Sequence, residues 1–361
     1  MVMNSEQYLT AITAIADETY AQIWRYLKGD ECLFEPHLRE VGGSYLEHRG
    51  KCLRPALLTF CCEAVGGSAE LARPAAAAVE MFHTWTLMHD DVIDHDDIRR
   101  GRPTAHVRGT SLGQGDLRLD AVAAREYGVD LAILGGDYIH GAAMDMLLSL
   151  GTASKVTIAL ARRMCWRLNA ELLAGEQLDV RLSQTPWSEI TEESVMKMMD
   201  GKTSALLSYC ALAGACIGED MEPDSSQFAE PLSDFAQYCG LAFQMKDDLL
   251  GVFGDETKFG KPIGSDIREG KRTVLMLRTM VGATAAERRR LESILGKADS
   301  TAEEIADART IVTRTGADKA VAELSDCFID KALAIMERTL PESDAKECLR
   351  HWTFSLVARA V

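Results

Sequence analysis

The stretch "HDDVIDHDDIRRGRPT" (His89–Thr104) gathers five aspartates and then three arginines directly after the mostly apolar segment "AAAAVEMFHTWTLM" (75–88). On a helix, Asp90 and Asp94 share a face, where like charges cost roughly 0.2–0.5 kcal/mol per pair. They also fall at the predicted helix C-terminus, where the helix dipole disfavours anions. The stretch is therefore either a solvated acidic face or a site where a divalent cation offsets the repulsion, because Mg²⁺ prefers carboxylate oxygens.

A second stretch repeats this order. "KDDLLGVFGDETKFGKPIG" (Lys246–Gly264) also ends an apolar helical segment, "FAQYCGLAFQM" (235–245). Each stretch reads Asp-Asp, two apolar residues, a polar loop and then Gly-basic-Pro, at 101–103 and 260–262. Two acidic helix ends that face one another could hold metal ions against a diphosphate, whose other oxygens nearby Arg and Lys would bind.

The rest of the chain is patterned as helix. It has 361 residues with 47% hydrophobic content, which is enough for a large core. Alternation at period two never persists, so we expect no strand. Capping boxes are predicted at Thr284–Glu287 and Thr301–Glu304, with Gly316 ending the second helix. We expect one all-α domain over residues 1–361, with long loops at 101–128 and 254–270.

Composition excludes several classes of protein. The net charge of -16 argues against a nucleic-acid partner, which needs a basic face. None of the ten cysteines belongs to a C-x-x-C pair, so we expect reduced thiols in a cytoplasmic protein. No apolar run approaches the length of a membrane span.

Five blocks follow one another along the chain: "GKCLRP" (50–55), "FHTWTLMHDDVIDHDDIRRGRPT" (82–104), "GEQLD" (175–179), "GKTSALL" (201–207) and "FQMKDDLLGVFGDETKFGKPIGSDIREGKRT" (243–273). In this order they resemble the trans-isoprenyl diphosphate synthases, or polyprenyl synthetases, of the short-chain type. The resemblance implies a single large helical bundle around a central cavity, the isoprenoid synthase fold, and a homodimer. It also implies Mg²⁺-dependent condensation of isopentenyl diphosphate with dimethylallyl, geranyl or farnesyl diphosphate.

The resemblance also implies a role for each site residue. About three Mg²⁺ ions per site, with Mn²⁺ as a substitute, would clamp the allylic diphosphate. Their ligands would be Asp90, Asp91, Asp94, Asp247 and Asp248, with Asp91 in a supporting or bridging role. The allylic diphosphate would also contact Arg99, Lys202, Thr203, Gln244 and Lys261. Isopentenyl diphosphate would bind Lys51, Arg54, His83 and Arg100, and Lys271 could contact either diphosphate. Catalysis would rest on Asp90, Asp94, Arg99, Lys202 and Asp247.

Without the resemblance, each of these residues has an ordinary interpretation. Lys51 and Lys271 would be surface lysines, His83 a core histidine, and Lys202-Thr203 a polar helix patch. Two departures from the family pattern also stand out. Gly251 replaces the last aspartate of the second motif, and "RGKCLRP" has Arg49 and Cys52 where the family often has Gly and Arg.

Large residues upstream of Asp90 are candidates for the floor of the product channel. These are Met81, Phe82 and Trp85, although ordinary core packing explains them equally well. If Trp85 lines the channel, the product is short, and we favour geranylgeranyl diphosphate over farnesyl diphosphate.

Two other functions remain open. A class I terpene cyclase would share the first motif but would need only one diphosphate site, and its second metal motif would typically carry Asn, Ser and Glu. A non-catalytic regulatory subunit of a synthase would usually lose one aspartate motif.

Overall fold

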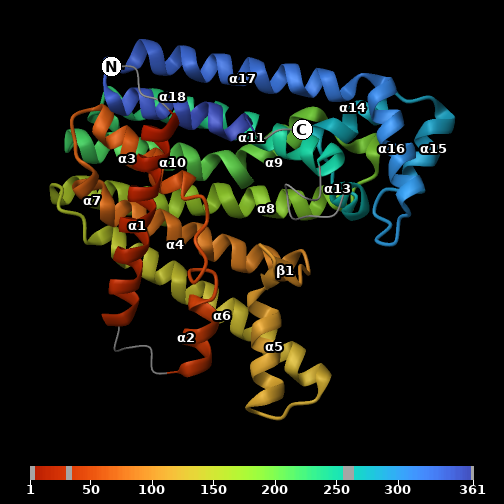
Figure 1. Ribbon diagram of the computed structural model, residues 1–361, viewed down its shortest axis with the longest axis horizontal. Coiled ribbons are helices and arrows are strands. Elements are labelled where there is room, and N and C mark those ends of the chain that lie inside the picture. The colour runs from red at the N-terminus through yellow and green to blue at the C-terminus, as the bar shows by residue number, and fades with distance from the viewer. Residues whose placement is uncertain (1–4, 30–34, 255–263, 359–361) are drawn as a thin grey trace. The chain divides into compact units, whose positions relative to one another are not determined.

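The computed structural model describes residues 5–29, 35–254 and 264–358, and these residues are almost entirely helical (Figure 1). The all-α prediction is confirmed. The elements are α1 (Ser5–Gly29), α2 (Pro36–Gly43), α3 (Leu53–Ala64), α4 (Ala69–Ile93), β1 (Ile98–Arg99), β2 (Arg102–Pro103), α5 (Ala105–Gly115), α6 (Ala121–Leu148), α7 (Ser154–Arg162), η1 (Arg163–Leu168), α8 (Asn169–Ser183), η2 (Trp187–Glu189), α9 (Glu192–Met199), η3 (Asp200–Ser204), α10 (Ala205–Glu219), η4 (Pro223–Ser225), α11 (Ala229–Phe253), α13 (Ser265–Glu269), α14 (Val274–Gly282), α15 (Ala285–Glu292), α16 (Ala302–Thr315), α17 (Ala317–Thr339) and α18 (Asp344–Val357).

Residue contacts divide the chain into two compact units. Unit 1 comprises Met1–Cys165, Cys210–Glu230 and Pro341–Leu349, and unit 2 comprises Trp166–Tyr209, Pro231–Leu340 and Arg350–Val361. The first aspartate-rich motif lies in unit 1 and the second lies in unit 2.

Helix α4 organises unit 1. It packs against α1, α3 and α6. The helix begins after Ser68, whose side chain accepts a hydrogen bond from the Leu71 amide. The alanines at 75–78 are buried, and their small side chains let the neighbouring helices approach closely. The first aspartate-rich motif is therefore built on the end of a firmly packed helix.

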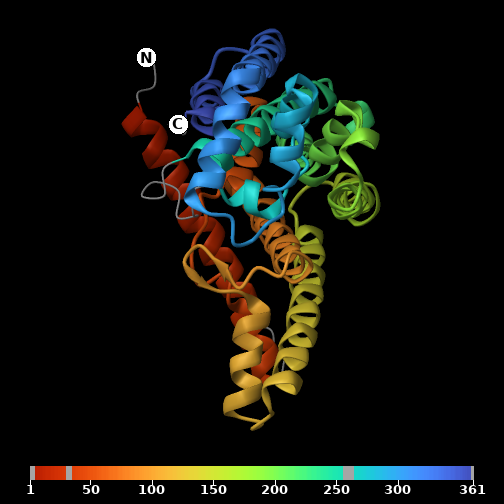
Figure 2. The same cartoon turned by 90° about the vertical axis from the view of Figure 1, so that its right-hand side faces the viewer.

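The predicted loop at 101–128 is wrong. Most of it forms α5 and the start of α6, which lie side by side (Figures 1 and 2). The glycines that suggested a loop serve this packing instead. A Cβ on Gly109 would lie 2.9 Å from Gly128 Cα, and one on Gly113 would lie 3.1 Å from Tyr127 Cδ1. Side chains at Gly109 and Gly113 would therefore hold the two helices apart.

The expectation of no strand is also wrong at one place. Strands β1 and β2 form a short antiparallel hairpin after α4, with Ile98 opposite Pro103. Its turn consists of Arg100 (φ 53°) and Gly101 (φ 73°), the conformation that suits a two-residue hairpin. A segment this short offers too little alternation to be recognised from sequence.

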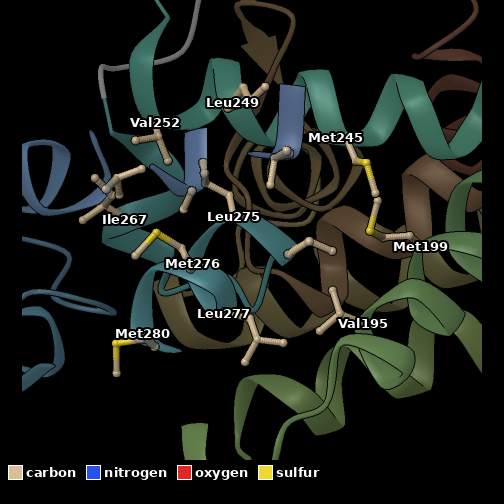
Figure 3. Close-up of a cluster of buried hydrophobic side chains, with 14 of the residues drawn as sticks. Val195, Met199, Met245, Leu249, Val252, Ile267, Leu275, Met276, Leu277 and Met280 are labelled. Atoms are coloured by element: carbon tan, nitrogen blue, oxygen red, sulfur yellow. The ribbon is translucent and has the colours of Figure 1, made fainter. Parts of the chain in front are cut away.

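Unit 2 is built around a buried cluster of aliphatic and sulfur-containing side chains. Val195, Met199, Met245, Leu249 and Leu275 point toward one another from α9, α11 and α14 (Figure 3). Both predicted capping boxes are present, at the starts of α15 and α16, and Gly316 ends α16 with φ 74°. The local start and stop signals were thus readable from sequence.

Two further features are the absence of a membrane-spanning helix among the described residues and the state of the cysteines. In the described ranges, no helix combines the length and the apolar composition needed to cross a bilayer. The cysteines among the described residues are free thiols, and most of them are buried.

The close contact between α5 and α6 predicts contrasting effects of alanine at two glycines of α6. In Gly128→Ala, the new Cβ would lie 2.2 Å from His106 O and 2.6 Å from Thr110 N. These are backbone atoms, so the helices must separate, and we expect a loss of about 1–3 kcal/mol. A Cβ at Gly141 meets nothing within 4 Å. Gly141→Ala should therefore leave the melting temperature unchanged or raise it, because alanine favours helix. Thermal unfolding of both variants checks this, and equal melting temperatures would contradict the packing argument.

Candidate active site

At the C-terminal end of α4, one arginine offsets the negative charges of two adjacent aspartates. Arg99 Nε donates to Asp91 Oδ1 at 2.6 Å, and Arg99 Nη2 donates to Asp90 Oδ2 at 2.9 Å. Asp91 is completely buried, and its other oxygen accepts a hydrogen bond from the Tyr45 hydroxyl. Asp91 thus anchors Arg99, while Asp94 is exposed at the helix C-cap.

These contacts shift the pKa values of the groups involved. Burial raises the pKa of Asp91, although Arg99 and the Tyr45 hydroxyl oppose the shift. Burial alone would lower the pKa of Arg99, but the hydrogen bond and charge of Asp91, together with Asp90, raise it above its usual range. Arg99 therefore keeps its positive charge at the site. Tyr45 was missed by sequence reasoning, because it lies in no motif and is far from Asp91 along the chain.

A second cationic group of unit 1 is formed by Arg54 and Arg100, with His83 hydrogen-bonded to Arg54. Arg54 Nη1 lies 3.1 Å from His83 Nε2. Arginine can only donate, so Nε2 is the acceptor and His83 carries its proton on Nδ1. Burial and the charge of Arg54 hold the pKa of His83 well below its usual value, so the imidazole is neutral. Within the described part of the chain, the buried Arg54 Nε finds no hydrogen-bond partner.

The "GKCLRP" loop borders the same group. A Cβ on Gly50 would lie 2.9 Å from Arg100 Nη2, so the guanidinium packs against this glycine. Cys52 (φ 49°) and Arg100 (φ 53°) both have left-handed backbone conformations, which are strained for these residues. Such strain persists where the surroundings fix it, often at functional sites. Lys51 in this loop is exposed.

In unit 2, two consecutive hydrogen bonds connect Thr203 to the second motif. Thr203 Oγ1 donates to Gln244 Oε1 at 2.9 Å, and Gln244 Nε2 donates to Asp248 Oδ1 at 2.9 Å. Asp248 is buried, and this burial and the charge of Asp266 raise its pKa well above its usual value. Asp247 is exposed. The two motifs therefore share a pattern in which the second aspartate is buried against polar partners and the first is more accessible.

Lys202 is held by the "GEQLD" block. Its Nζ lies 2.7 Å from Asp179 Oδ2 and 3.1 Å from Glu176 Oε2. Lys202 and Thr203 lie in η3, a π-helical turn of the kind often found at functional sites. A Cβ on Gly175 would lie 2.3 Å from Lys202 N, so the glycine permits the close approach of α8 to η3.

Asp266 supplies a carboxylate beside the second motif that sequence reasoning missed. A Cβ on Gly251 would lie 2.0 Å from Asp266 Oδ2, so Asp266 fills the space where a side chain at 251 would begin. Lys271 Nζ pairs with Asp266 Oδ1 at 3.2 Å and with Glu269 Oε2 at 3.0 Å. The signal for Asp266 in the sequence was Gly251 at the end of the motif, because a glycine leaves room for the side chain of another residue. Lys261 lies outside the described residues.

The candidate channel residues all lie on α4, in unit 1. Met81, Phe82 and Trp85 are buried. Trp85 Nε1 donates to His89 Nδ1 at 3.1 Å, and His89 Nε2 lies 3.1 Å from the Ile133 carbonyl oxygen. The Trp85 ring also lies 4.3 Å from the His140 ring, centroid to centroid. Trp85 is therefore fixed in one orientation between α4 and α6.

The carboxylates fit a particular mode of metal binding. Among the described residues, no three His, Cys, Asp or Glu side chains are grouped as ligands for one ion. Each motif can instead offer one or two carboxylates. This suits Mg²⁺, which commonly takes one or two protein carboxylates and completes its shell with water and substrate phosphate oxygens.

The helical fold of the described residues is the isoprenoid synthase fold. Residues 35–312 match the family model of the polyprenyl synthetases, and the chain belongs to this family. It is a prenyltransferase.

Named relatives and solved structures agree with this family. The short chain isoprenyl diphosphate synthase of Methanothermobacter thermautotrophicus is 36% identical over 300 residues, covering 83% of each chain. The geranylgeranyl diphosphate synthase of Sulfolobus acidocaldarius is 33% identical over 320 residues, covering 88% of each. The crystal structure of geranylgeranyl pyrophosphate synthetase from Pyrococcus horikoshii superposes with a TM-score of 0.83 at 28% identity, covering 98% of this chain and 100% of that one.

The contact between Gly251 and Asp266 predicts that the family aspartate cannot simply be restored. Gly251→Asp would force a third carboxylate against Asp266 and Asp248, and we expect a loss of stability of about 2 kcal/mol or more. Removing the competing side chain in Gly251→Asp/Asp266→Ala should recover part of that loss. Thermal unfolding measures both, with Asp266→Ala alone as the control. A Gly251→Asp protein as stable as the wild type would show that Asp266 does not occupy this space.

Proposed function

We propose that this prenyltransferase condenses isopentenyl diphosphate with an allylic diphosphate to give geranylgeranyl diphosphate. The names of the relatives support the product class, because two of the most similar are a short chain isoprenyl diphosphate synthase and a geranylgeranyl diphosphate synthase. The observation that carries the proposal is the second cationic group in unit 1. The hydrogen bond between Arg54 and His83 and the packing of Arg100 against Gly50 are contacts distinct from those of Arg99 with Asp90 and Asp91, so cations remain for the second diphosphate that a two-substrate enzyme requires.

We further propose that residues 1–361 act as one catalytic domain, in which Asp90, Asp94 and Asp247 serve the same allylic diphosphate through Mg²⁺. Asp91 and Asp248 support them from buried positions. Bound Mg²⁺ supplies Lewis-acid stabilisation of the charge that develops on the departing diphosphate.

The chain's own cations complete the binding of the allylic diphosphate. Arg99 is held in place by Asp90 and Asp91, so its remaining N–H groups can bind a diphosphate oxygen without rearrangement. Lys202 lies at the π-helical turn, and Thr203 and Gln244 hydrogen-bond to each other. Together with Lys261, these side chains orient the leaving group.

The second substrate would use the other cationic group. Lys51, Arg54 and Arg100 bind the diphosphate of isopentenyl diphosphate, and neutral His83 accepts from Arg54 and so fixes the guanidinium plane. Lys271, paired with Asp266 and Glu269, contacts either diphosphate.

The reaction forms one carbon–carbon bond and breaks one carbon–oxygen bond. The allylic C1–O bond breaks, and its electron pair leaves with the diphosphate. The double bond of isopentenyl diphosphate then attacks the allylic cation, and the resulting cation loses a proton to the released diphosphate. The protein's part is to orient the two substrates and stabilise the leaving charge.

We also propose that the enzyme is a cytoplasmic homodimer. Buried free thiols suit a reducing compartment. Helix α6 exposes the large aliphatic side chains Val122, Ile133, Leu134 and Leu148, and exposed apolar groups concentrated on one element often mark an interface.

Removal of the first aspartate tests the function. Asp90→Ala should lower condensation by at least about 10²–10³-fold, because the diphosphate loses a carboxylate that holds its metal ions. Asp96→Ala, in the same stretch but without an assigned role, is the control. The measurement is product formation by each variant and the wild type, with and without isopentenyl diphosphate. Normal turnover by Asp90→Ala would refute the metal assignment, and product formed without isopentenyl diphosphate would indicate a cyclase.

Truncation of Trp85 tests the control of chain length. Trp85→Ala should yield longer prenyl diphosphates, because it opens space beneath the growing chain. Phe60→Ala is the control, since Phe60 is buried in unit 1 but is not one of the channel candidates. Both truncations should cost about 3–5 kcal/mol of stability. Mass analysis of the products decides the matter, and an unchanged product spectrum in Trp85→Ala would leave Trp85 with a packing role only.

A further inference from the structure

A buried tyrosine and a buried glutamate lie behind the "GKCLRP" loop. Tyr20 belongs to α1 and Glu80 to α4, and their exposed fractions are 3% and 5%. The Tyr20 hydroxyl donates to Glu80 Oε1 at 3.1 Å and accepts from the Gly50 amide at 3.2 Å. One hydroxyl therefore links a buried carboxylate to the backbone of the residue before Lys51. Tyr20 lies outside the matched residues 35–312.

Burial of the Glu80 carboxylate costs free energy of folding. A carboxylate removed from water is destabilising unless charges and hydrogen bonds compensate it. Burial raises the pKa of Glu80, while the charge of Arg54, the hydrogen bond from Tyr20 and the charge of Arg100 oppose this shift. The compensating cations are thus two of the residues assigned to isopentenyl diphosphate. Glu80 is therefore close enough to Arg54 and Arg100 for their charges to act on it.

The loop itself needs support from its neighbours. Gly50 is bounded by the Tyr20 hydroxyl and by the Arg100 guanidinium. Arg49 Cζ lies 5.7 Å from the centroid of the Tyr20 ring, and Cys52 has a left-handed backbone with φ 49°. A strained loop keeps its conformation only when surrounding contacts fix it. Tyr20 supplies contacts to two residues of this loop.

We propose that Tyr20 and Glu80 form a positioning pair that holds the segment at residues 49–54, which leads into α3, and with it Lys51, Arg54 and Arg100, in the geometry that binds the diphosphate of isopentenyl diphosphate. Neither member of the pair touches substrate. The proposal rests on the proposed function and assigns to the N-terminal helix a part in binding only one of the two substrates.

The test compares two tyrosines of the same helix. Tyr20→Phe removes the bridging hydroxyl and keeps the ring. Tyr26→Phe is the matched control, because its hydroxyl also donates to a carboxylate oxygen, at 2.7 Å, but this is Asp145 Oδ2 of α6. For Tyr20→Phe, we expect the KM for isopentenyl diphosphate to rise about tenfold, with kcat and the KM for the allylic substrate unchanged within about twofold. Calorimetric binding of isopentenyl diphosphate alone should weaken by a similar factor. Tyr26→Phe should change neither quantity.

A second variant separates charge from hydrogen bonding. Glu80→Gln keeps a hydrogen-bond acceptor for Tyr20 but removes the carboxylate whose charge interacts with Arg54. This variant should also raise the KM for isopentenyl diphosphate selectively. The combined effect of Tyr20→Phe and Glu80→Gln should be smaller than the product of the single effects, since both act on one unit.

Several outcomes would overturn the proposal. An unchanged KM for isopentenyl diphosphate in a folded Tyr20→Phe enzyme would do so, as would an equal rise in both KM values, which indicates general loosening. A wild-type enzyme that neither binds nor condenses isopentenyl diphosphate would instead overturn the proposed function itself, and this inference with it.

Discussion

The Arg99 guanidinium, fixed between Asp90 and Asp91, is the interaction on which the first motif depends. Without it, adjacent carboxylates at the negative end of a helix would repel one another and oppose the helix dipole. With Asp91 buried against Tyr45, the arginine is held before any substrate arrives. Preorganised charge of this kind stabilises a leaving anion without reorganisation during the reaction.

Unit 2 shows a similar arrangement, in which a buried aspartate has a polar partner and a cation is held by carboxylates. Asp248 is buried and accepts from Gln244, while exposed Asp247 precedes it. Lys202 is held by Asp179 and Glu176, as Arg99 is held by the first motif. In both units, therefore, a cation assigned to the allylic diphosphate owes its position to carboxylates of the protein. A net charge of -16 is compatible with anionic substrates because local cations and metal ions decide the sign at the site.

The sequence predicted the helical class and the two capping boxes, because periodicity and cap residues act locally. It mistook α5 for a loop, since the glycines that weaken a helix in isolation are required where α5 meets α6. It grouped Arg54 with His83 and Thr203 with Gln244 only through the family resemblance, and the structure brings both pairs into contact. Tyr45 and Tyr20 could not be found, because each acts on a motif from a distant position along the chain and no local pattern marks it. Asp266 lies inside the fifth block, and Gly251 was the signal that another group fills the space beside the motif. The roles of the site residues remain proposals that rest on these contacts.

The central proposal is that the two aspartate motifs, one in each unit, each bind metal ions that hold the same diphosphate. The most direct measurement is a crystal structure of the enzyme with Mg²⁺ and a non-cleavable allylic thiodiphosphate. The account predicts metal ions that connect Asp90 and Asp94, and separately Asp247, to oxygens of one diphosphate group. A diphosphate bound through the first motif alone, with Asp247 distant from every ion, would contradict it.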